Sequence, residues 1–208
     1  IAPVSAFCSM SGMMMFMIVP RAEVCADRIM EVLTTTPAIS DPESGKVLGA
    51  GRATFALNGV SFRFPGAERD VLSNITLELA PGTTTAVIGS TGSGKTTLVN
   101  LLPRLIDPTK GTVTANGVPL SKLSLSVRER VALVPQRAHL FAGTVASNLR
   151  LGAPGATDDQ LWEALDIAQA REFITDLDAE VESGGKNFSG GQRQRLTIAR
   201  ALVRRADL

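Results

Sequence analysis

An apolar stretch without a single charged side chain opens the chain and covers residues 1–19. Its length is close to the roughly 20 apolar residues that a helix needs to cross a bilayer. No basic residue precedes the stretch, as a signal peptide would require, and the chain begins with Ile rather than Met. We therefore expect the end of a transmembrane helix, in an internal piece of a longer protein, rather than a signal peptide or a buried helix of a soluble protein.

The pattern changes at Pro20, after which acidic and apolar residues alternate at helical spacing as far as Leu33. This predicts that the apolar helix continues as an amphipathic helix in water. Residues 34–52 are rich in Thr, Pro, Ser and Gly and have no apolar period, which is typical of a linker. The expected organisation is a helical segment at 1–33, a linker at 34–52 and a globular domain at 53–208.

The globular part begins with strand patterns. Apolar and polar residues alternate over 60–64 and 75–79, which predicts two strands of an antiparallel sheet with one covered face. Asn116-Gly117 predicts a hairpin, and the apolar runs 83–88 and 131–134 predict buried central strands of a parallel sheet. Helical patterns lie at 95–102, 144–151 and 158–177. Together they indicate an α/β fold with an antiparallel β subdomain and a helical subdomain.

Composition narrows the functional classes. With 21 Lys and Arg against 20 Asp and Glu, the formal net charge is only +1, so the total does not indicate a nucleic-acid or polyanion binder. Any affinity for phosphate must therefore come from local geometry. Cys8 and Cys25 have neither the spacing of a metal site nor that of a redox pair, and we expect them to be small buried apolar side chains.

The strongest local signal is the run Gly-Ser-Thr-Gly-Ser-Gly-Lys-Thr-Thr at positions 89–97. It matches the phosphate-loop pattern G-x-x-x-x-G-K-[ST], with an expected strand before it and an expected helix after it. The alternative, a flexible turn with a solvated lysine, is disfavoured because nine consecutive residues and both flanks fit the motif. The candidate nucleotide-binding residues are therefore Gly89, Ser90, Thr91, Gly92, Ser93, Gly94, Lys95, Thr96 and Thr97.

The residue types of this loop have a physical reason. The glycines let the backbone curl so that N–H groups form a nest for phosphate oxygens at the positive end of the following helix. Lys95 is expected to reach the β- and γ-phosphates of a nucleotide, and the hydroxyl of Thr96 to ligate Mg²⁺. Other phosphate-loop NTPases share this motif, so the loop alone leaves the family open.

A second candidate anion site begins at Ser189, which is followed by Gly190, Gly191, Gln192 and an apolar-striped helical pattern. A serine hydroxyl and free backbone N–H groups at a helix N-terminus suit a phosphate approached from outside, whereas a plain N-cap needs no ligand. These residues resemble the signature motif of ATP-binding-cassette (ABC) proteins. In that family the motif closes over ATP held by the phosphate loop of a second subunit, so the resemblance implies that Ser189, Gly190, Gly191 and Gln192 act in trans.

Two further positions match the family's pattern in the expected order. Phe64, next to Pro65, falls where the family has an aromatic residue that stacks on adenine; the alternative is a core residue of the strand. Gln136 resembles the glutamine loop, which approaches Mg²⁺ and the attacking water. The resemblance thus implies catalytic roles for Lys95 and Gln136, Mg²⁺ ligation by Thr96 and Gln136, and ATP and Mg²⁺ as cofactors.

The order of the parts resembles that of exporters which fuse membrane and ATPase domains in one chain, as multidrug and lipid exporters do. Residues 20–33 resemble the junction between these domains. The resemblance implies ATP binding and hydrolysis that drive export across a membrane, with the plasma membrane expected and the ATPase domain on its cytoplasmic side. The implied partners are a second ABC subunit in a homodimer or heterodimer, the chain's own transmembrane domain and the membrane, but no nucleic acid.

Some features depart from the family's pattern. Phe188 replaces the commoner leucine at the start of the signature, and Ser183 stands where many exporters have a glutamate. The chain ends at Leu208, before the family's Walker B aspartate, general-base glutamate and switch histidine, and His139 is not the counterpart of that histidine. We therefore expect an incomplete domain that exposes the apolar segments 83–88 and 131–134 and does not hydrolyse ATP by itself at a rate typical of the family.

Two other functions stay open on the sequence. A soluble ABC ATPase acting on nucleic acid or ribosomes would carry the same motifs, but the near-neutral charge and the apolar start count against it. A non-catalytic nucleotide-binding fragment is the second alternative, because the residues that supply a general base are not in the chain.

Overall fold

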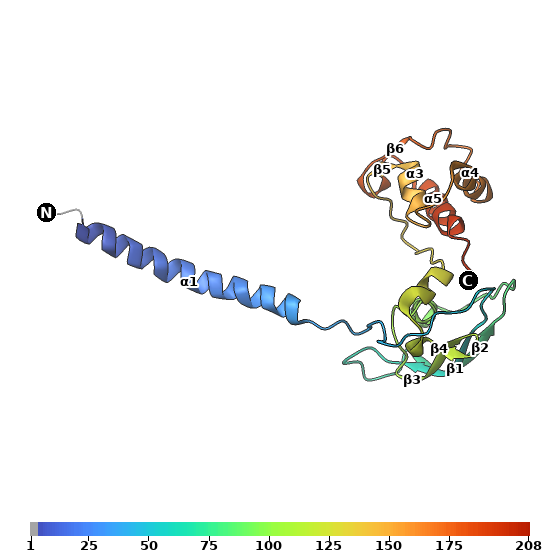
Figure 1. The fold of residues 1–208 in the computed structure, drawn as a ribbon, viewed down its shortest axis with the longest axis horizontal. Helices are drawn as coiled ribbons and strands as arrows, with labels where there is room; N and C mark the ends of the chain where they lie inside the picture. The colour runs from blue at the N-terminus through green and yellow to red at the C-terminus, as the bar shows by residue number, and fades with distance from the viewer. Residues whose placement is uncertain (1–3) are drawn as a thin grey trace. The chain divides into compact units, whose positions relative to one another are not determined.

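The N-terminal part of the chain is one long helix. The computed structural model describes the backbone of residues 4–208 and the side chains of residues 18–208, and it divides into two compact units, Ile1–Ser40 and Asp41–Leu208. Helix α1 (Val4–Thr34) continues through Pro20 without a break (Figure 1). This confirms the expected continuation of the helix beyond Pro20.

The apolar segment expected at residues 1–19 lies almost entirely outside the described side chains. Among the residues that the structure describes, no helix has a stretch long and apolar enough to span a membrane. The side chain of Cys8 also lies outside the described part. Cys25 is exposed, so the expectation of burial is wrong for this residue, because no second element packs against α1 within the described part of its unit.

An antiparallel sheet organises the first half of the second unit. Its strands are β1 (Phe55–Phe62), β2 (Leu72–Leu79), β3 (Lys110–Ala115) and β4 (Val118–Pro119), in the order β2-β1-β3-β4 (Figure 1). The two predicted strands are confirmed, but β1 ends at Phe62, before Phe64. The predicted hairpin is confirmed as well, with positive φ angles of 49° at Asn116 and 75° at Gly117, as its two-residue turn requires.

One face of this sheet is covered by α2 (Lys95–Leu101) and by two short 3₁₀ helices, η1 (Leu120–Lys122) and η2 (Leu125–Arg130). The centre of this core is supplied by Phe55, Leu57 and Val60 of β1, which are fully buried, and a register shift between Leu57 and Val60 keeps both on the covered face. The helix expected at 95–102 is therefore confirmed, and its burial fixes the end of the phosphate loop against the sheet.

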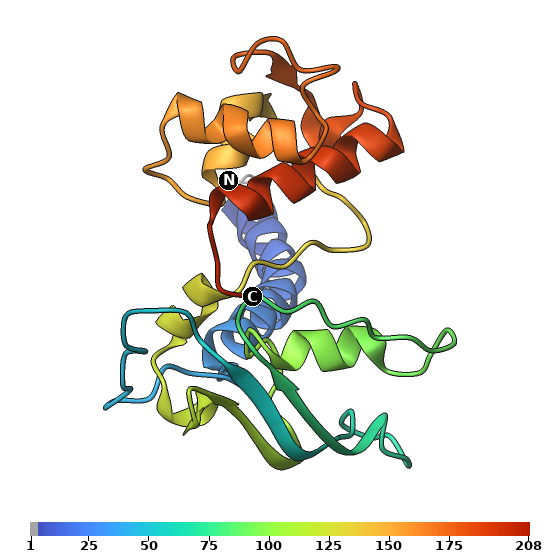
Figure 2. The same ribbon diagram turned by 90° about the vertical axis from the view of Figure 1, so that its right-hand side faces the viewer.

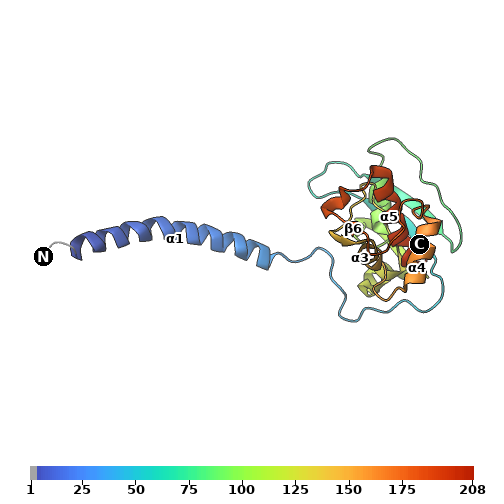
Figure 3. The same cartoon turned by 90° about the horizontal axis from the view of Figure 1, so that it is seen from above.

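The second half of the unit has a core of its own. It contains α3 (Val145–Arg150), α4 (Asp158–Ile167), α5 (Gly190–Val203), the two-stranded sheet of β5 (Gly143–Thr144) and β6 (Glu180–Val181), and the 3₁₀ helix η3 (Ser183–Gly185). Helix α5 packs against both α3 and α4 (Figure 3). Leu161 and Leu165 of α4 are fully buried in this second core, which confirms a helical subdomain.

The helix expected at 158–177 is shorter than its pattern suggested and ends at Ile167. Gln169 adopts a positive φ of 54°, and the N–H of Ala170 donates to the carbonyl of Leu165 at 2.8 Å. This left-handed cap satisfies carbonyl groups at the helix end and turns the chain away. The apolar period beyond it belongs to an irregular segment in which Ile174 and Leu177 are still buried.

The strands expected at 83–88 and 131–134 are wrong as strands. Neither segment forms a ladder with a neighbour in the described part of the chain, and a strand exists only through such pairing. One bond from the N–H of Ala132 to the carbonyl of Leu208, at 2.8 Å, is too little for a strand. Segment 83–88 is exposed as expected, with Ile88 at 93%. In segment 131–134 Leu133 is 39% exposed but Val131 is buried in the core beneath the sheet, so the expected exposure is wrong for Val131.

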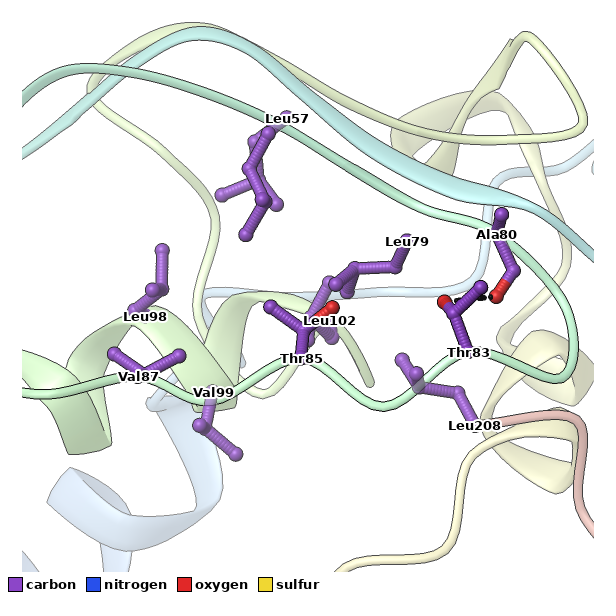
Figure 4. Close-up of a pocket in the computed structure, with 11 residues that line it drawn as sticks. Leu57, Leu79, Ala80, Thr83, Thr85, Val87, Leu98, Val99, Leu102 and Leu208 are labelled. Carbon is purple, nitrogen blue, oxygen red and sulfur yellow. Dashed lines mark hydrogen bonds between the residues drawn. The ribbon is translucent and has the colours of Figure 1, made fainter.

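Segment 83–88 nevertheless lies close to the first core. Thr83, Thr85 and Val87 line an apolar cavity of about 160 Å³ together with side chains of β1, β2, α2 and Leu208 (Figure 4). The hydroxyl of Thr83 donates to the carbonyl of Ala80 at 2.7 Å.

In Figure 2 the extended segments before α3 and after α5 run between the sheet and the helical subdomain.

The second half of the expected linker is attached to the globular unit. The carboxylate of Asp41 accepts hydrogen bonds from the N–H of Leu125 at 3.0 Å and the hydroxyl of Ser124 at 3.3 Å. The guanidinium of Arg130 donates to the carbonyls of Gly49 and Gly51. Residues 41–51 are therefore irregular in conformation and yet held by specific contacts.

Candidate functional site

The phosphate loop, Phe64 and Gln136 line one cavity of about 570 Å³. These three features lie far apart along the chain, and the resemblance to ABC proteins implies that all three contact one nucleotide. The structure therefore brings most of the predicted site together. The lining residues are Phe64, Val71, Thr91, Gly92, Ser93, Gly94, Lys95, Thr96, Thr97 and Gln136.

The lysine of the loop folds back over the loop's own backbone. Lys95 Nζ donates to the carbonyls of Gly89 at 2.7 Å and Ser90 at 2.8 Å, and lies 3.4 Å from the hydroxyl of Ser93. Gly89 and Ser90 do not line the cavity, so they contribute through these carbonyls. The ammonium group is thus held at the loop, where its positive charge faces any anion that enters the curve of the backbone.

Gly94 shows why this loop needs a glycine immediately before the lysine. Its φ angle is 87°, a left-handed conformation, and it is the N-cap of α2. A Cβ atom at this position would lie 2.8 Å from Leu72 Cδ2 and 3.0 Å from the carbonyl oxygen of Val71. The loop therefore closes directly onto the first residues of β2 and its approach, and any side chain would push the two apart.

Phe64 lies in the loop between β1 and β2, outside the strand in which its alternation first placed it. Its ring is 48% exposed and makes an edge-to-face contact with the buried ring of Phe62, with centroids 4.8 Å apart and planes at 90°. The core alternative for Phe64 therefore disagrees with the structure. One ring edge is anchored in the protein, and the ring also lines the cavity.

Oxygen donors for a hard cation are present in the same cavity. Thr96 supplies a hydroxyl and Gln136 an amide, and both line the cavity with the phosphate loop. Among the described residues no cluster of three or more His, Cys, Asp or Glu side chains could hold a metal by itself. Mg²⁺ does not require such a cage, because it commonly keeps several waters and takes one or two protein ligands beside substrate phosphates. The donor set fits Mg²⁺.

The signature residues lie at a different place in the unit. Ser189 is the N-cap of α5: its hydroxyl accepts the N–H of Gln192 at 3.2 Å, and the Gln192 side chain accepts the N–H of Ser189 at 2.8 Å. Ser189, Gly190 and Gly191 do not line the phosphate-loop cavity, and both glycines are exposed. The N-cap geometry is thus present, and the structure leaves this helix start open to solvent.

Arg200 links α5 to the segment after Gln136. Its guanidinium donates to the carbonyl of His139 at 2.6 Å, and burial lowers the pKa of Arg200 from its ordinary value. An arginine stays protonated at neutral pH despite such a shift. The ring of His139 packs against Phe141, with centroids 5.1 Å apart, and does not line the cavity.

Sequence reasoning missed two contributors to the site. Val71 lines the cavity, and Arg63 pairs with Asp70 at 2.7 Å across the base of the loop that carries Phe64. A usable signal for the pair was present, since two opposite charges flank a turn that contains Pro65-Gly66. Val71 carries no such signal, because its position depends on how β2 meets the phosphate loop.

Comparison with known proteins places the chain in a family. The profile of the family described as ABC transporter matches residues 72–208. An uncharacterized ABC transporter ATP-binding protein of Mycobacterium tuberculosis is 49% identical over 195 residues, which are 90% of this chain and 34% of that protein. An ATP-dependent lipid A-core flippase of Chromobacterium violaceum is 43% identical over 174 residues, or 81% of this chain and 30% of the flippase.

A solved structure agrees with these relatives. A bacterial Atm1-family ABC exporter with ATP bound superposes with a TM-score of 0.83 and 28% sequence identity, over 93% of this chain and 34% of the exporter chain. The chain thus spans about a third of the length of the proteins that it matches. On the profile match, the identities and the fold, the chain belongs to the ABC transporter family and contains part of its ATP-binding domain.

Proposed function

We propose that this chain binds Mg²⁺-ATP in the cavity formed by Phe64, the phosphate loop and Gln136, and that ATP hydrolysis in the longer protein drives export of a substrate across a membrane. The observation that carries the proposal is the convergence of these three features on one cavity. The match to an Atm1-family exporter supports the direction of transport, and the match to an ATP-dependent flippase supports a transport role for ATP.

Different residues of the cavity would bind different parts of the nucleotide. The exposed face of Phe64 would stack on adenine, a contact that needs only the aromatic ring. The backbone N–H groups of 89–96 and the ammonium of Lys95 would hold the phosphates, because the loop curls at the start of α2. On ATP binding, Lys95 would exchange part of its bonds to Gly89 and Ser90 for bonds to phosphate oxygens.

Thr96 and Gln136 would hold Mg²⁺ beside the phosphates. When bound, the ion neutralises charge on the β- and γ-phosphate oxygens. Gln136 would also orient the water that attacks the γ-phosphate. Its side chain is exposed and lines the cavity, so a water can reach both the amide and the phosphate position.

The signature residues would act on the nucleotide of a second subunit. Ser189, Gly190 and Gly191 form the start of α5 and lie outside the chain's own cavity. A partner in a homodimer or heterodimer would therefore present its ATP to this helix start. We further propose that the chain's own transmembrane domain holds the protein in the plasma membrane, with the ATPase part on the cytoplasmic side.

Replacing Phe64 by alanine is expected to weaken ATP binding about fivefold, the equivalent of roughly 1 kcal/mol for an aromatic stacking contact. Binding of inorganic tripolyphosphate, which has no adenine, should stay unchanged. Isothermal titration calorimetry on the purified protein measures both ligands. Phe141→Ala is the matched control, since Phe141 is also an exposed phenylalanine but lies outside the cavity. Equal losses for ATP and tripolyphosphate would show that Phe64 is a structural residue.

Ser189→Arg is expected to leave ATP binding to the same chain's phosphate loop unchanged while abolishing hydrolysis at the partner's nucleotide. An arginine at this helix start would fill the place of the partner's γ-phosphate. The measurement is ATP turnover in mixed dimers of the full-length protein that carry the substitution in one subunit. Thr175→Arg, at an exposed hydroxyl residue of the helical subdomain, is the control. Loss of turnover only at the mutant subunit's own phosphate loop would contradict action in trans.

A further inference from the structure

The loop that carries Phe64 is closed at its tip by a tight turn. The N–H of Ala67 donates to the carbonyl of Phe64 at 3.0 Å, and Pro65 and Gly66 occupy the two central positions. Gly66 has a φ angle of 77°, and a positive φ at the second central position is what a type II turn requires. The turn fixes the local shape of the loop, but it does not determine where the loop stands relative to the strands.

The base of the same loop is closed by an ion pair. Arg63 Nε donates to Asp70 Oδ1 at 2.7 Å, directly after the end of β1 and two residues before β2. On the strand side of this ion pair, the N–H of Val71 donates to the carbonyl of Phe62 at 2.8 Å. The side chains are 48% and 27% exposed, so the pair lies on the surface and contributes little to global stability.

The base of this loop lies between two segments that line the nucleotide cavity, the Phe64 loop and the approach to β2. Phe64 follows Arg63 in the chain, and Val71 follows Asp70. The carbonyl oxygen of Val71 and the side chain of Leu72 leave no space for a Cβ atom on Gly94. Arg63 is therefore the sequence neighbour of Phe64, the residue proposed to stack on adenine. Asp70 is the sequence neighbour of Val71, whose carbonyl packs against the phosphate loop.

We infer that the Arg63–Asp70 ion pair is a positioning device for nucleotide binding: it sets the spacing between the ring of Phe64 and the phosphate nest at Gly94 and Lys95. This inference rests on the proposed function of the cavity. It predicts that the pair matters for ligands that occupy both halves, such as ATP. A ligand that occupies the phosphate half alone, such as tripolyphosphate, is indifferent to it.

The opposite charges of the two residues allow a test, because a positioning role and a purely electrostatic role predict different directions of change in ATP affinity. Arg63→Gln removes a positive charge near an anionic ligand, and Asp70→Asn removes a negative one. If the pair acted only through the electrostatic field, the two substitutions would change ATP affinity in opposite directions. Because positioning requires both partners, we expect each substitution to weaken ATP binding relative to tripolyphosphate binding by roughly two- to fivefold, the range for an exposed ion pair.

The experiment measures the ratio of the dissociation constants for tripolyphosphate and ATP by calorimetry. The electrostatic contribution is largely shared by the two ligands and cancels in this ratio. Arg69→Gln is the matched control, because it removes the same charge from the same loop and Arg69 has no ion pair in the described part of the chain. The charge-swapped variant Arg63→Asp/Asp70→Arg keeps the net charge and should recover most of the wild-type ratio.

The outcomes separate the inference from the function on which it rests. A reduced ratio for both single variants, an unchanged ratio for Arg69→Gln and recovery in the swapped variant would support a positioning role. Tighter ATP binding by Asp70→Asn, or an unchanged ratio in both single variants, would overturn it while leaving ATP binding established. Failure of the wild-type protein to bind ATP at all would overturn the proposed function instead.

Discussion

We expect Lys95→Ala to lower the affinity for ATP by about one to two orders of magnitude, because a hydrogen bond to a charged group contributes roughly 1.5–3 kcal/mol. Lys95 is the cationic side chain among those that line the cavity. Its ammonium already lies against the carbonyls of Gly89 and Ser90, so it needs little rearrangement to meet a phosphate. Without it, the loop retains only backbone N–H groups and side-chain hydroxyls as donors to the phosphates.

The affinity is measured by calorimetry on the purified protein, and under the proposed function ATP-driven transport by the full-length protein should be abolished in parallel. Lys186→Ala is the control, since Lys186 is exposed and lies outside the cavity. Amide exchange in α2 shows whether the variant keeps its fold, which we expect because Leu98 and Leu101 anchor this helix in the core. Unchanged ATP affinity in the folded variant would contradict the phosphate-loop assignment.

We expect Leu161→Ala to destabilise the helical subdomain by about 2–5 kcal/mol, the range for truncating a fully buried leucine. Leu161 has no exposed surface and lies in the core that joins α3, α4 and α5. This core shares no residue with the one beneath the sheet. We therefore expect the loss to concentrate in the helical subdomain, and ATP affinity at the phosphate loop to change by less than about twofold, since residues without shared partners act nearly independently.

The matched variant is Leu57→Ala, which truncates an equally buried leucine in the core of the sheet. It should weaken ATP binding, because β1 and α2 support both Phe64 and the phosphate loop. Amide exchange resolved by segment distinguishes the two variants, and calorimetry gives the ATP affinity of each. If Leu161→Ala accelerated exchange in β1 and α2 as much as in α4 and α5, the two cores would form one cooperative unit.

Local signals accounted for the elements that depend on few neighbours. Asn116-Gly117 predicted its hairpin because both residues tolerate a positive φ, and Ser189 predicted a helix start because its hydroxyl can satisfy a backbone N–H group. The phosphate loop was recognisable for the same reason, since its glycines and its lysine act within nine consecutive residues.

Elements that depend on distant partners were less predictable. Segment 83–88 has the composition of a buried strand, but it has no ladder neighbour in the described part of the chain and stays exposed. The helix at 158–167 ended early because Gln169 adopts a left-handed conformation that its residue type does not announce. Val71 entered the site through its contact with Gly94, a meeting of two loops that neither periodicity nor a motif indicates.

The three helices of the helical subdomain begin with the same reciprocal cap, formed by Thr144 with Ser147, Thr157 with Gln160, and Ser189 with Gln192. In each, the capping hydroxyl accepts an N–H group and still has a proton to donate. The first turns after the caps differ, since α3 continues with buried Val145 and Ala146, α4 with the acidic Asp158 and Asp159, and α5 with two bare glycines. The capping hydroxyl of α5 is therefore the one of these three that can donate to an incoming anion without meeting the side chains of the first turn, as at α3, or acidic residues, as at α4. The hydroxyl oxygen of Ser189 accepts the capping N–H of Gln192 through a lone pair, whereas a bond to a phosphate would use the hydroxyl proton. A nucleotide would therefore bind and leave at Ser189 without breaking the cap of α5.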